Sequence, residues 1–576
     1  MERLMRTRLP GLALMGVLSV VGAGALAQAE ADRRLDAAIA RLRAALGPDS
    51  RLEIGGRSVD PVSGHATLTN VVLSQGPNHL TVPELRLAEV SEARIGRAEL
   101  LRSVYRGAEG ATGEVARVLL AGMPVPAEGK ALEIANLAFE ALEVEAVRMD
   151  DPAKGALRLE RLEVRDFTPQ GVGAGLLNGF EFRDRAADGQ MMRLGRVELA
   201  SVTLPMRAGD FDPVAFRAGR IAVEDAALRD PDSSVTIGLG RLALQDWVPG
   251  RVTSLAVERL QLATPAGGMG AVEFSLARFD AAGIDAAQTL EAVMGGIQVP
   301  DPQPGTPQRV LLEGLQANWE GQPLLALARL LTEGSLQDGI ARGGMVAEGL
   351  RVVPPAGRAD WLEALGYREI AGGWELRGNV PRAGGRLEIA PFRIGWEQAG
   401  ALSLAAQLDG MPALPAEGTA VDPDATAAQL TEARLAGLTL ALRDQGLLGR
   451  VLARQAREQR MPEARLREQW AQMALAIPMP GERPQRGQRG GPPPAPAPSK
   501  GSAVPSKGAA QQAAPAPGAD PLPPIRQAIA SFIRQPGTLE ITLRPPTPLS
   551  FAEMGNLQAG GPVQAIQRLG LSIVAR

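Results

Sequence analysis

The residues best suited to acid–base or metal chemistry are few in this chain of 576 residues. The sequence holds two histidines, His65 and His79, and no cysteine. Neither histidine lies in a spacing such as HExxH, which places two zinc ligands on one helix face. Without cysteine the chain has no thiol nucleophile and no thiolate metal ligand. We therefore expect both histidines to be strand or turn residues.

Paired carboxylates could in principle catalyse glycoside hydrolysis or bind calcium. The candidate pairs are Asp210 with Asp212, Asp230 with Asp232, and Asp422 with Asp424. Each pair lies beside a proline, in a context where aspartate caps backbone amides of a turn. The sequence also lacks the Gly-x-Ser-x-Gly elbow and a phosphate-binding glycine loop. We predict no catalytic residue, no cofactor-binding residue and no metal ligand, and hence a protein that is not an enzyme.

The amino-terminal segment has the pattern of an export signal. Arg3, Arg6 and Arg8 precede an apolar run that ends in the small-residue motif Ala25-Leu26-Ala27. This order is typical of a signal peptide. We predict a signal peptide over residues 1–27 and a periplasmic protein. The alternative is an uncleaved inner-membrane anchor, because the apolar run approaches the roughly 20 residues that a spanning helix needs.

The overall composition narrows the possible partners and the kind of core. The net charge is −3 with acids and bases interspersed, which argues against a nucleic-acid partner. Aromatic residues make up 3% of the chain and hydrophobic residues 45%, so the core must consist mainly of aliphatic side chains. The 67 glycines and 46 prolines indicate many turns.

Apolar residues recur with a period of five through residues 51–300. In each unit two apolar residues flank one other residue, and a two-residue spacer separates that pair from the next. Clear units are Leu142/Val144, Val147/Met149, Leu157/Leu159, Leu162/Val164, Ile221/Val223 and Leu255/Val257. A helix repeats every 3.6 residues and a flat strand every two, so the pattern fits neither directly.

Two arrangements of strands fit this period. In the first, the chain bends or bulges in each spacer, so that every pair points into one core. In the second, the strand is two-sided with apolar pairs on both faces. Charged residues between the apolar ones, such as Glu143 and Arg158, favour the first. We therefore predict a mainly β protein with helical additions, built on an elongated, curled antiparallel β-repeat sheet. A β-solenoid is the alternative, since Ala135–Phe139 resembles one pentapeptide-repeat unit.

The remaining segments have other patterns. Residues 28–50 predict an amino-terminal helix, because Leu35, Ile39, Leu42 and Leu46 share one helix face. Residues 301–477 predict a region of mixed strands and helices. The predicted helices are 324–331, 336–340 and 360–365, and a helical hairpin is predicted over 446–476. The predicted strands are 374–376, 387–394, 402–408 and 435–442. Residues 478–522 read as a disordered linker rich in Pro, Gly and Ala. Residues 523–576 predict a helix, a strand, two short helices and a final strand that completes a sheet.

The paired aliphatics of Leu157–Val164 and Met192–Leu199 resemble those of AsmA-like and TamB-like proteins of Gram-negative envelopes. The resemblance covers roughly residues 60–290 and parts of 385–445. It implies a long β-repeat sheet forming a groove, and a part in lipid movement or outer-membrane biogenesis. It implies no site residue for this chain.

Two functions follow as hypotheses. The first is a non-enzymatic periplasmic envelope protein that binds or shields phospholipid or another envelope lipid through an apolar β surface, or supports envelope biogenesis. The second is a structural protein with a closed β core that docks an envelope protein.

Overall fold

The computed structural model describes most of the chain. The described residues are 35–37, 39–40, 50–60, 63, 65–90, 94–124, 137–186, 189–207, 210–230, 233, 235–267, 270–355, 357–416, 418–420, 422, 424, 428, 431–476, 522–557 and 561–576. The predicted signal peptide and residues 478–521 of the predicted linker lie outside them. Within the predicted amino-terminal helix, residues 35–37 and 39–40 are helical.

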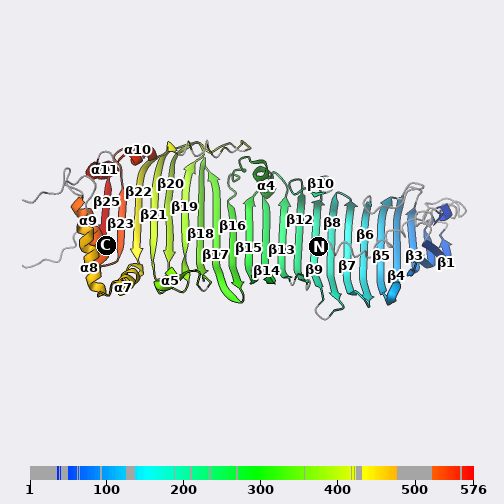
Figure 1. Ribbon diagram of the computed structural model, residues 1–576. Coiled ribbons are helices and arrows are strands. Elements are labelled where there is room, and N and C mark those ends of the chain that lie inside the picture. The colour runs from blue at the N-terminus through cyan, green and yellow to red at the C-terminus, as the bar shows by residue number, and fades with distance from the viewer. Residues whose placement is uncertain are drawn as a thin grey trace, which may run out of the picture. The chain divides into compact units, whose positions relative to one another are not determined.

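The chain divides into two compact units. The first contains the residues up to Leu336 together with Pro415–Val421, and the second contains Gln337–Leu414 and Asp422–Arg576. Both units are built mainly from long antiparallel strands that follow one another along the chain (Figure 1). The predicted mainly β fold is therefore confirmed. The solenoid alternative is wrong, because neighbouring strands pair antiparallel in register instead of stacking as parallel coils.

The first unit is an open antiparallel sheet. Its strands are β1 (Ser50–Val59), β2 (Ala66–Gln75), β3 (Asn78–Val90), β4 (Arg94–Arg106), β5 (Thr112–Pro124), β6 (Phe139–Asp151), β7 (Gly155–Thr168), β8 (Gly171–Asp184), β9 (Met191–Thr203), β12 (Arg217–Asp230), β13 (Val235–Trp247), β14 (Thr253–Gly267), β15 (Gly270–Ile284), β16 (Gln308–Trp319) and β17 (Gln322–Gln337). A short turn of helix η1 (Ala108–Gly110), a hairpin of β10 (Met206–Arg207) and β11 (Asp210–Phe211), and helix α4 (Ala286–Gly295) lie in the connections.

The two-residue spacers explain the period of five. In β6, Val144 and Val147 are both buried in one core, and Leu142 and Met149 pack against it. Simple alternation would send Val144 and Val147 to opposite faces, because three positions separate them. Ala146, the second spacer residue, has φ 50° and breaks the alternation. A non-glycine residue with positive φ occupies the same spacer position in eight further strands, at Asn70, Glu89, Arg102, Asp166, Ser201, Asp225, Asp246 and Arg259. The predicted bent, one-sided strand is confirmed.

Glycine on the neighbouring strand faces several of the left-handed spacer residues at close range. A Cβ on Gly96 would lie 2.4 Å from Glu89 Cβ and 2.7 Å from the Glu89 carbonyl oxygen. Glu89 has φ 52°. A Cβ on Gly173 would likewise lie 2.8 Å from the Cβ of Asp166. The glycines therefore permit the close approach that the bent spacers require.

The second unit combines a sheet with helices. Its strands are β18 (Ile340–Val352), β19 (Ile370–Pro381), β20 (Gly385–Trp396), β21 (Gly400–Met411), β22 (Arg434–Asp444), β23 (Thr538–Leu543), β24 (Leu549–Ser550) and β25 (Leu571–Ala575). Its helices are α5 (Asp360–Ala364), α7 (Leu447–Gln459), α8 (Glu463–Ala476), α9 (Leu522–Arg534), α10 (Phe551–Asn556) and α11 (Pro562–Leu569). The final strand β25 pairs with β23, which pairs with β22, so it completes the sheet as predicted.

Two local predictions were wrong. Residues 324–331 lie in strand β17, and residues 336–340 form its end, a turn and the start of β18. Leu327 and Leu330 are paired with Leu315 and Leu312 of β16, and this ladder outweighs a spacing that also suits a helix. Helix α4, by contrast, interrupts a region predicted to be all strands. Its amino end is capped by Asp285, whose carboxylate accepts a hydrogen bond from the Gln288 amide at 2.9 Å.

Candidate functional site: the apolar face of the sheet

A continuous row of apolar residues crosses the first unit from β2 to β17. Directly opposite residues of an antiparallel pair lie on the same face, so the printed registers define the row. Its members, in order of strands, are Leu68, Leu85, Leu100, Val118, Val144, Leu162, Leu177, Val197, Val223, Leu242, Val257, Phe279, Leu312 and Leu330. We call this the central row.

Parallel rows widen the central row into an apolar face. One runs through Met149, Leu157, Phe182, Met192, Leu228, Ile237, Leu262 and Phe274. Another includes Leu199, Ile221, Leu244 and Leu255. The bent spacers keep all these rows on one side, so the face is several side chains wide on each strand.

Burial of the apolar face changes along the sheet. Near the amino end, Leu68 is 1% exposed and Leu85 2%, and the helical residues Leu35 and Ile39 belong to the same core. Farther along the central row, Val223 and Leu242 are only partly buried. The same face is therefore closed at the β2–β4 end and partly open to solvent from about β8 onward.

The second unit has an apolar face of its own. One row runs through Met345, Leu376, Phe392, Leu404, Leu440, Ile541 and Ile573. Leu376 is 39% exposed, which is high for a leucine in a sheet. At the end of the row, Ile573 packs against Leu522 and Ile525 of α9. Helix α9 thus covers the apolar face at the last strands, whereas the face is partly accessible at Leu376 of β19.

The opposite face of the first unit is polar and carries ion pairs. Arg117 lies 2.7 Å from Glu99, 3.4 Å from Glu143 and 3.3 Å from Glu145. The hydrogen bond to Glu99 raises the pKa of the Arg117 guanidinium, and burial acts against this. Farther along, a hydrogen bond from Arg196 lowers the pKa of Glu198. These charges keep one face hydrated, which leaves the apolar face as the candidate binding surface.

Among the described residues, the titratable side chains noted in the sequence do not assemble a reactive centre. His79 Nδ1 lies 2.9 Å from Ser74 Oγ, and His65 is exposed in a loop. Asp212 accepts hydrogen bonds from the Val214 and Ala215 amides, as expected of a turn aspartate.

The other carboxylate pairs behave similarly. Asp230 accepts a hydrogen bond from Ser233 Oγ at 2.7 Å, and Asp422 accepts one from the Asp424 amide at 3.0 Å. Asp210 is exposed in β11, and Asp232 lies outside the described residues. Within the described part of the chain, no cluster of three or more His, Asp or Glu side chains could hold a metal ion.

One polar cluster had no signal in the sequence. Arg450 of α7 lies over the ring of Tyr367, 4.3 Å from its centroid. Its guanidinium also donates to the Gly366 carbonyl oxygen at 2.9 Å and to Gln398 Oε1 at 3.1 Å. These contacts tie α7 to the loop after α5, so their role is structural. The partners are far apart in sequence, which explains why no local pattern predicted them.

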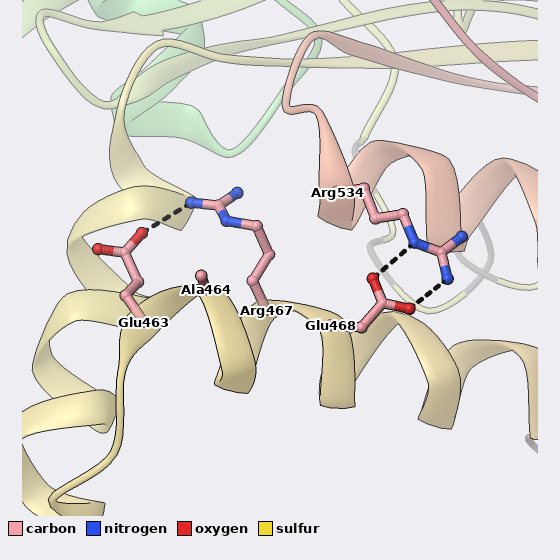
Figure 2. Close-up of a pocket in the computed structure, with 5 residues that line it drawn as sticks. All are labelled: Glu463, Ala464, Arg467, Glu468 and Arg534. Carbon is pink, nitrogen blue, oxygen red and sulfur yellow. Dashed lines mark hydrogen bonds and ion pairs between the residues drawn. The ribbon is translucent and has the colours of Figure 1, made fainter.

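A surface depression between α8 and α9 is lined by two ion pairs (Figure 2). Glu468 binds Arg534 in a bidentate pair, with distances of 2.9 and 2.7 Å. Glu463 pairs with Arg467 at 2.8 Å. Both guanidinium groups are thus paired with carboxylates of the same protein, and the Glu468–Arg534 pair joins α8 to α9.

The Glu468–Arg534 pair predicts a pH dependence of helix docking. The hydrogen bond from Arg534 lowers the pKa of Glu468 to about 2. A carboxylate with a depressed pKa stabilises the folded state above its unfolded pKa of ~4.3, and that contribution is lost as pH falls through about 2. We expect hydrogen-exchange protection of α8 and α9, corrected for intrinsic rates, to fall between pH 5 and pH 2. Glu468→Gln should flatten this change, and an unaltered pH profile would contradict the assignment.

Comparison with known proteins gives limited information. One sequence family, described only as "Uncharacterized protein", matches residues 393–488 and 502–576. This match covers the carboxyl-terminal strands and helices of the second unit and, of the first unit, only Pro415–Val421. No curated protein matches the chain. Among the described residues, no helix combines the length and apolar character needed to cross a membrane.

Proposed function

We propose that this chain is a non-enzymatic periplasmic envelope protein that binds the acyl chains of lipids along its apolar face. The observation that carries the proposal is the partly exposed stretch of the central row from about β8 to β17. The predicted export signal and the resemblance to AsmA-like and TamB-like proteins support the periplasmic location and the envelope role.

The geometry of the apolar face suits an extended hydrocarbon chain. Neighbouring strands lie roughly 4.8 Å apart, so a chain lying across the strands meets an aliphatic side chain at each one. The strand backbones hydrogen-bond to each other and therefore present few unpaired polar groups to the ligand. Each methylene removed from water contributes about 0.8 kcal/mol, so several strands together can bind a long acyl chain. The ion pairs on the opposite face keep that side in water.

A second function stays open as an alternative: a structural protein with a closed core that docks an envelope partner. The nearly complete burial of Leu68, Val82 and Ile95 at the β2–β4 end favours a closed core in that part of the sheet. In the first function the partly exposed strands contact lipid acyl chains, whereas in the second they contact a partner protein.

The test compares lipid content in two matched variants. Leu242→Asn with Val257→Asn places amides on adjacent strands within the central row. Thr236→Asn with Ser254→Asn changes exposed residues on the opposite face of the same two strands. In native mass spectrometry, wild type and the second variant should carry copurified phospholipid. The first variant should lose it by about tenfold or more, because polar groups on the binding face cost affinity.

Circular dichroism of both variants checks that the sheet is retained. Wild-type protein that repeatedly lacks lipid would refute the proposal, as would equal lipid content in the two variants. A lipid-free protein that instead forms a stable complex in envelope pull-downs would support the docking alternative.

A further inference from the structure

Exposed large apolar side chains of the first unit concentrate in two connections. Met206 (62% exposed) and Phe211 (49%) lie in the β10–β11 hairpin, and Val293 (62%) and Met294 (66%) lie on α4. Leu204 and Val299, next to these elements, are exposed as well. Most soluble proteins scatter such side chains singly, and a cluster usually marks an interaction surface.

Both connections lie along the same border of the sheet, one that is formed by the ends of the strands. We call this border the edge. The hairpin joins the end of β9 to the start of β12, where Thr203 is paired with Arg217. Strand β15 ends at Ile284, which is paired with Thr253 at the start of β14, and α4 follows directly. Strands β9 and β15 run in the same direction, so both end at this edge. The β10–β11 hairpin and α4 follow these strand ends and therefore lie on the same side, as Figure 1 shows. We call Met206, Phe211, Val293 and Met294 the edge patch.

The β10–β11 part of the edge patch adjoins the apolar face. The outermost row of that face near this edge runs through Phe139, Phe167, Val172, Val202, Ala218 and Trp247. Leu204 follows Val202 in the repeat and leads directly into the hairpin. The Trp247 indole N–H is shielded from solvent and has no acceptor among the described residues.

The charges on this edge give little reason for attraction to anionic headgroups. Asp210 and Asp212 adjoin Phe211, and Arg207 adjoins Met206. Two arginines of this edge are bound within the protein: Arg217 donates to the Phe216 carbonyl oxygen at 2.8 Å, and Arg251 pairs with Asp246 at 3.1 Å. Binding through buried apolar area depends little on salt, whereas binding through basic residues weakens as salt screens it.

We propose that the edge patch inserts into the surface of a zwitterionic membrane and delivers lipid from it to the apolar face. This inference rests on the proposed lipid-binding function. The partner of the edge patch is a lipid surface for two reasons. The patch adjoins a face proposed to hold acyl chains, and its acidic neighbours disfavour an anionic partner.

The experiment uses flotation with vesicles of phosphatidylcholine and phosphatidylethanolamine. The test variant carries Met206→Ser, Phe211→Ser, Val293→Ser and Met294→Ser. The control variant changes four exposed apolar residues elsewhere: Val272→Ser, Trp361→Ser, Trp396→Ser and Met473→Ser. Wild type and control should float with the vesicles at low and high salt. The test variant should lose vesicle binding by about tenfold or more, since its serines no longer bury apolar surface in the lipid.

A second measurement separates this inference from the proposed function. A pyrene-labelled fatty acid, below its micellar concentration, should bind wild type and the test variant equally, because neither membrane contact nor the edge patch is needed for a soluble ligand. If wild type fails to bind it, the proposed function fails, and flotation still decides the membrane contact.

Several results would overturn the inference. These are wild type that does not float, a test variant that floats like wild type, and binding confined to anionic vesicles and reversed by salt. A test variant that also loses the soluble fatty acid would place the patch within the binding face instead. A wild-type dimer that becomes monomeric in the variant, without vesicle binding, would make the patch a protein interface.

Discussion

Leu85→Ala is expected to destabilise the β2–β4 end of the first unit by about 2–5 kcal/mol, the range for deleting a buried leucine side chain. Leu85 is 2% exposed between Leu68 and Leu100, its direct partners on the neighbouring strands. Truncation removes apolar burial and leaves a cavity that the neighbouring strands can fill only in part. Native-state hydrogen exchange of the β2–β4 amides measures the effect locally, which suits a protein of two units.

The matched control is Leu242→Ala, in the same central row. Leu242 is only partly buried, so we expect a local cost of about 1 kcal/mol or less. The two substitutions delete the same atoms from the same position of the repeat. Equal costs at the two sites would show that the apolar face is closed along its whole length, against the proposed lipid-binding function.

Gly96→Ala is expected to destabilise the β3–β4 ladder by about 1–3 kcal/mol, the usual cost of overpacking. The added methyl group would lie 2.7 Å from the Glu89 carbonyl oxygen and 2.4 Å from Glu89 Cβ, so the backbone must move. Glu89 is held at φ 52° by the bent spacer and has little freedom to adjust. Faster hydrogen exchange of the β3 and β4 amides is the expected observation.

Gly395→Ala is the control for that substitution. Gly395 lies in strand β20, and a Cβ there meets no atom within 4 Å. Alanine at such a position should be neutral or stabilising by up to roughly 1 kcal/mol, because it restricts the unfolded chain. If the two substitutions change stability equally, the close approach of Gly96 to Glu89 is not the reason why glycine occupies position 96.

Local patterns in the sequence were sufficient for the β-repeat and for the carboxyl-terminal elements. Pairs such as Leu142/Val144 and Val147/Met149 establish the period of five. The polar residues between the apolar ones indicate which face of the sheet is exposed to water. The carboxyl-terminal helices were predicted from helical spacing between recognisable turn residues. In β17, by contrast, the leucines suit both a helix and a strand, and pairing with β16 decides between them.

The sequence by itself therefore determined that the strands are one-sided and that aspartates such as Asp212 serve turns, because both depend on residues a few positions apart. Only the tertiary structure decided how exposed each part of the apolar face is. Leu85 and Leu242 occupy equivalent positions in the repeat, yet one is buried and the other partly open. The difference depends on which distant segments pack over the sheet. The edge patch likewise arises only when the register brings the β10–β11 hairpin and α4 to one edge.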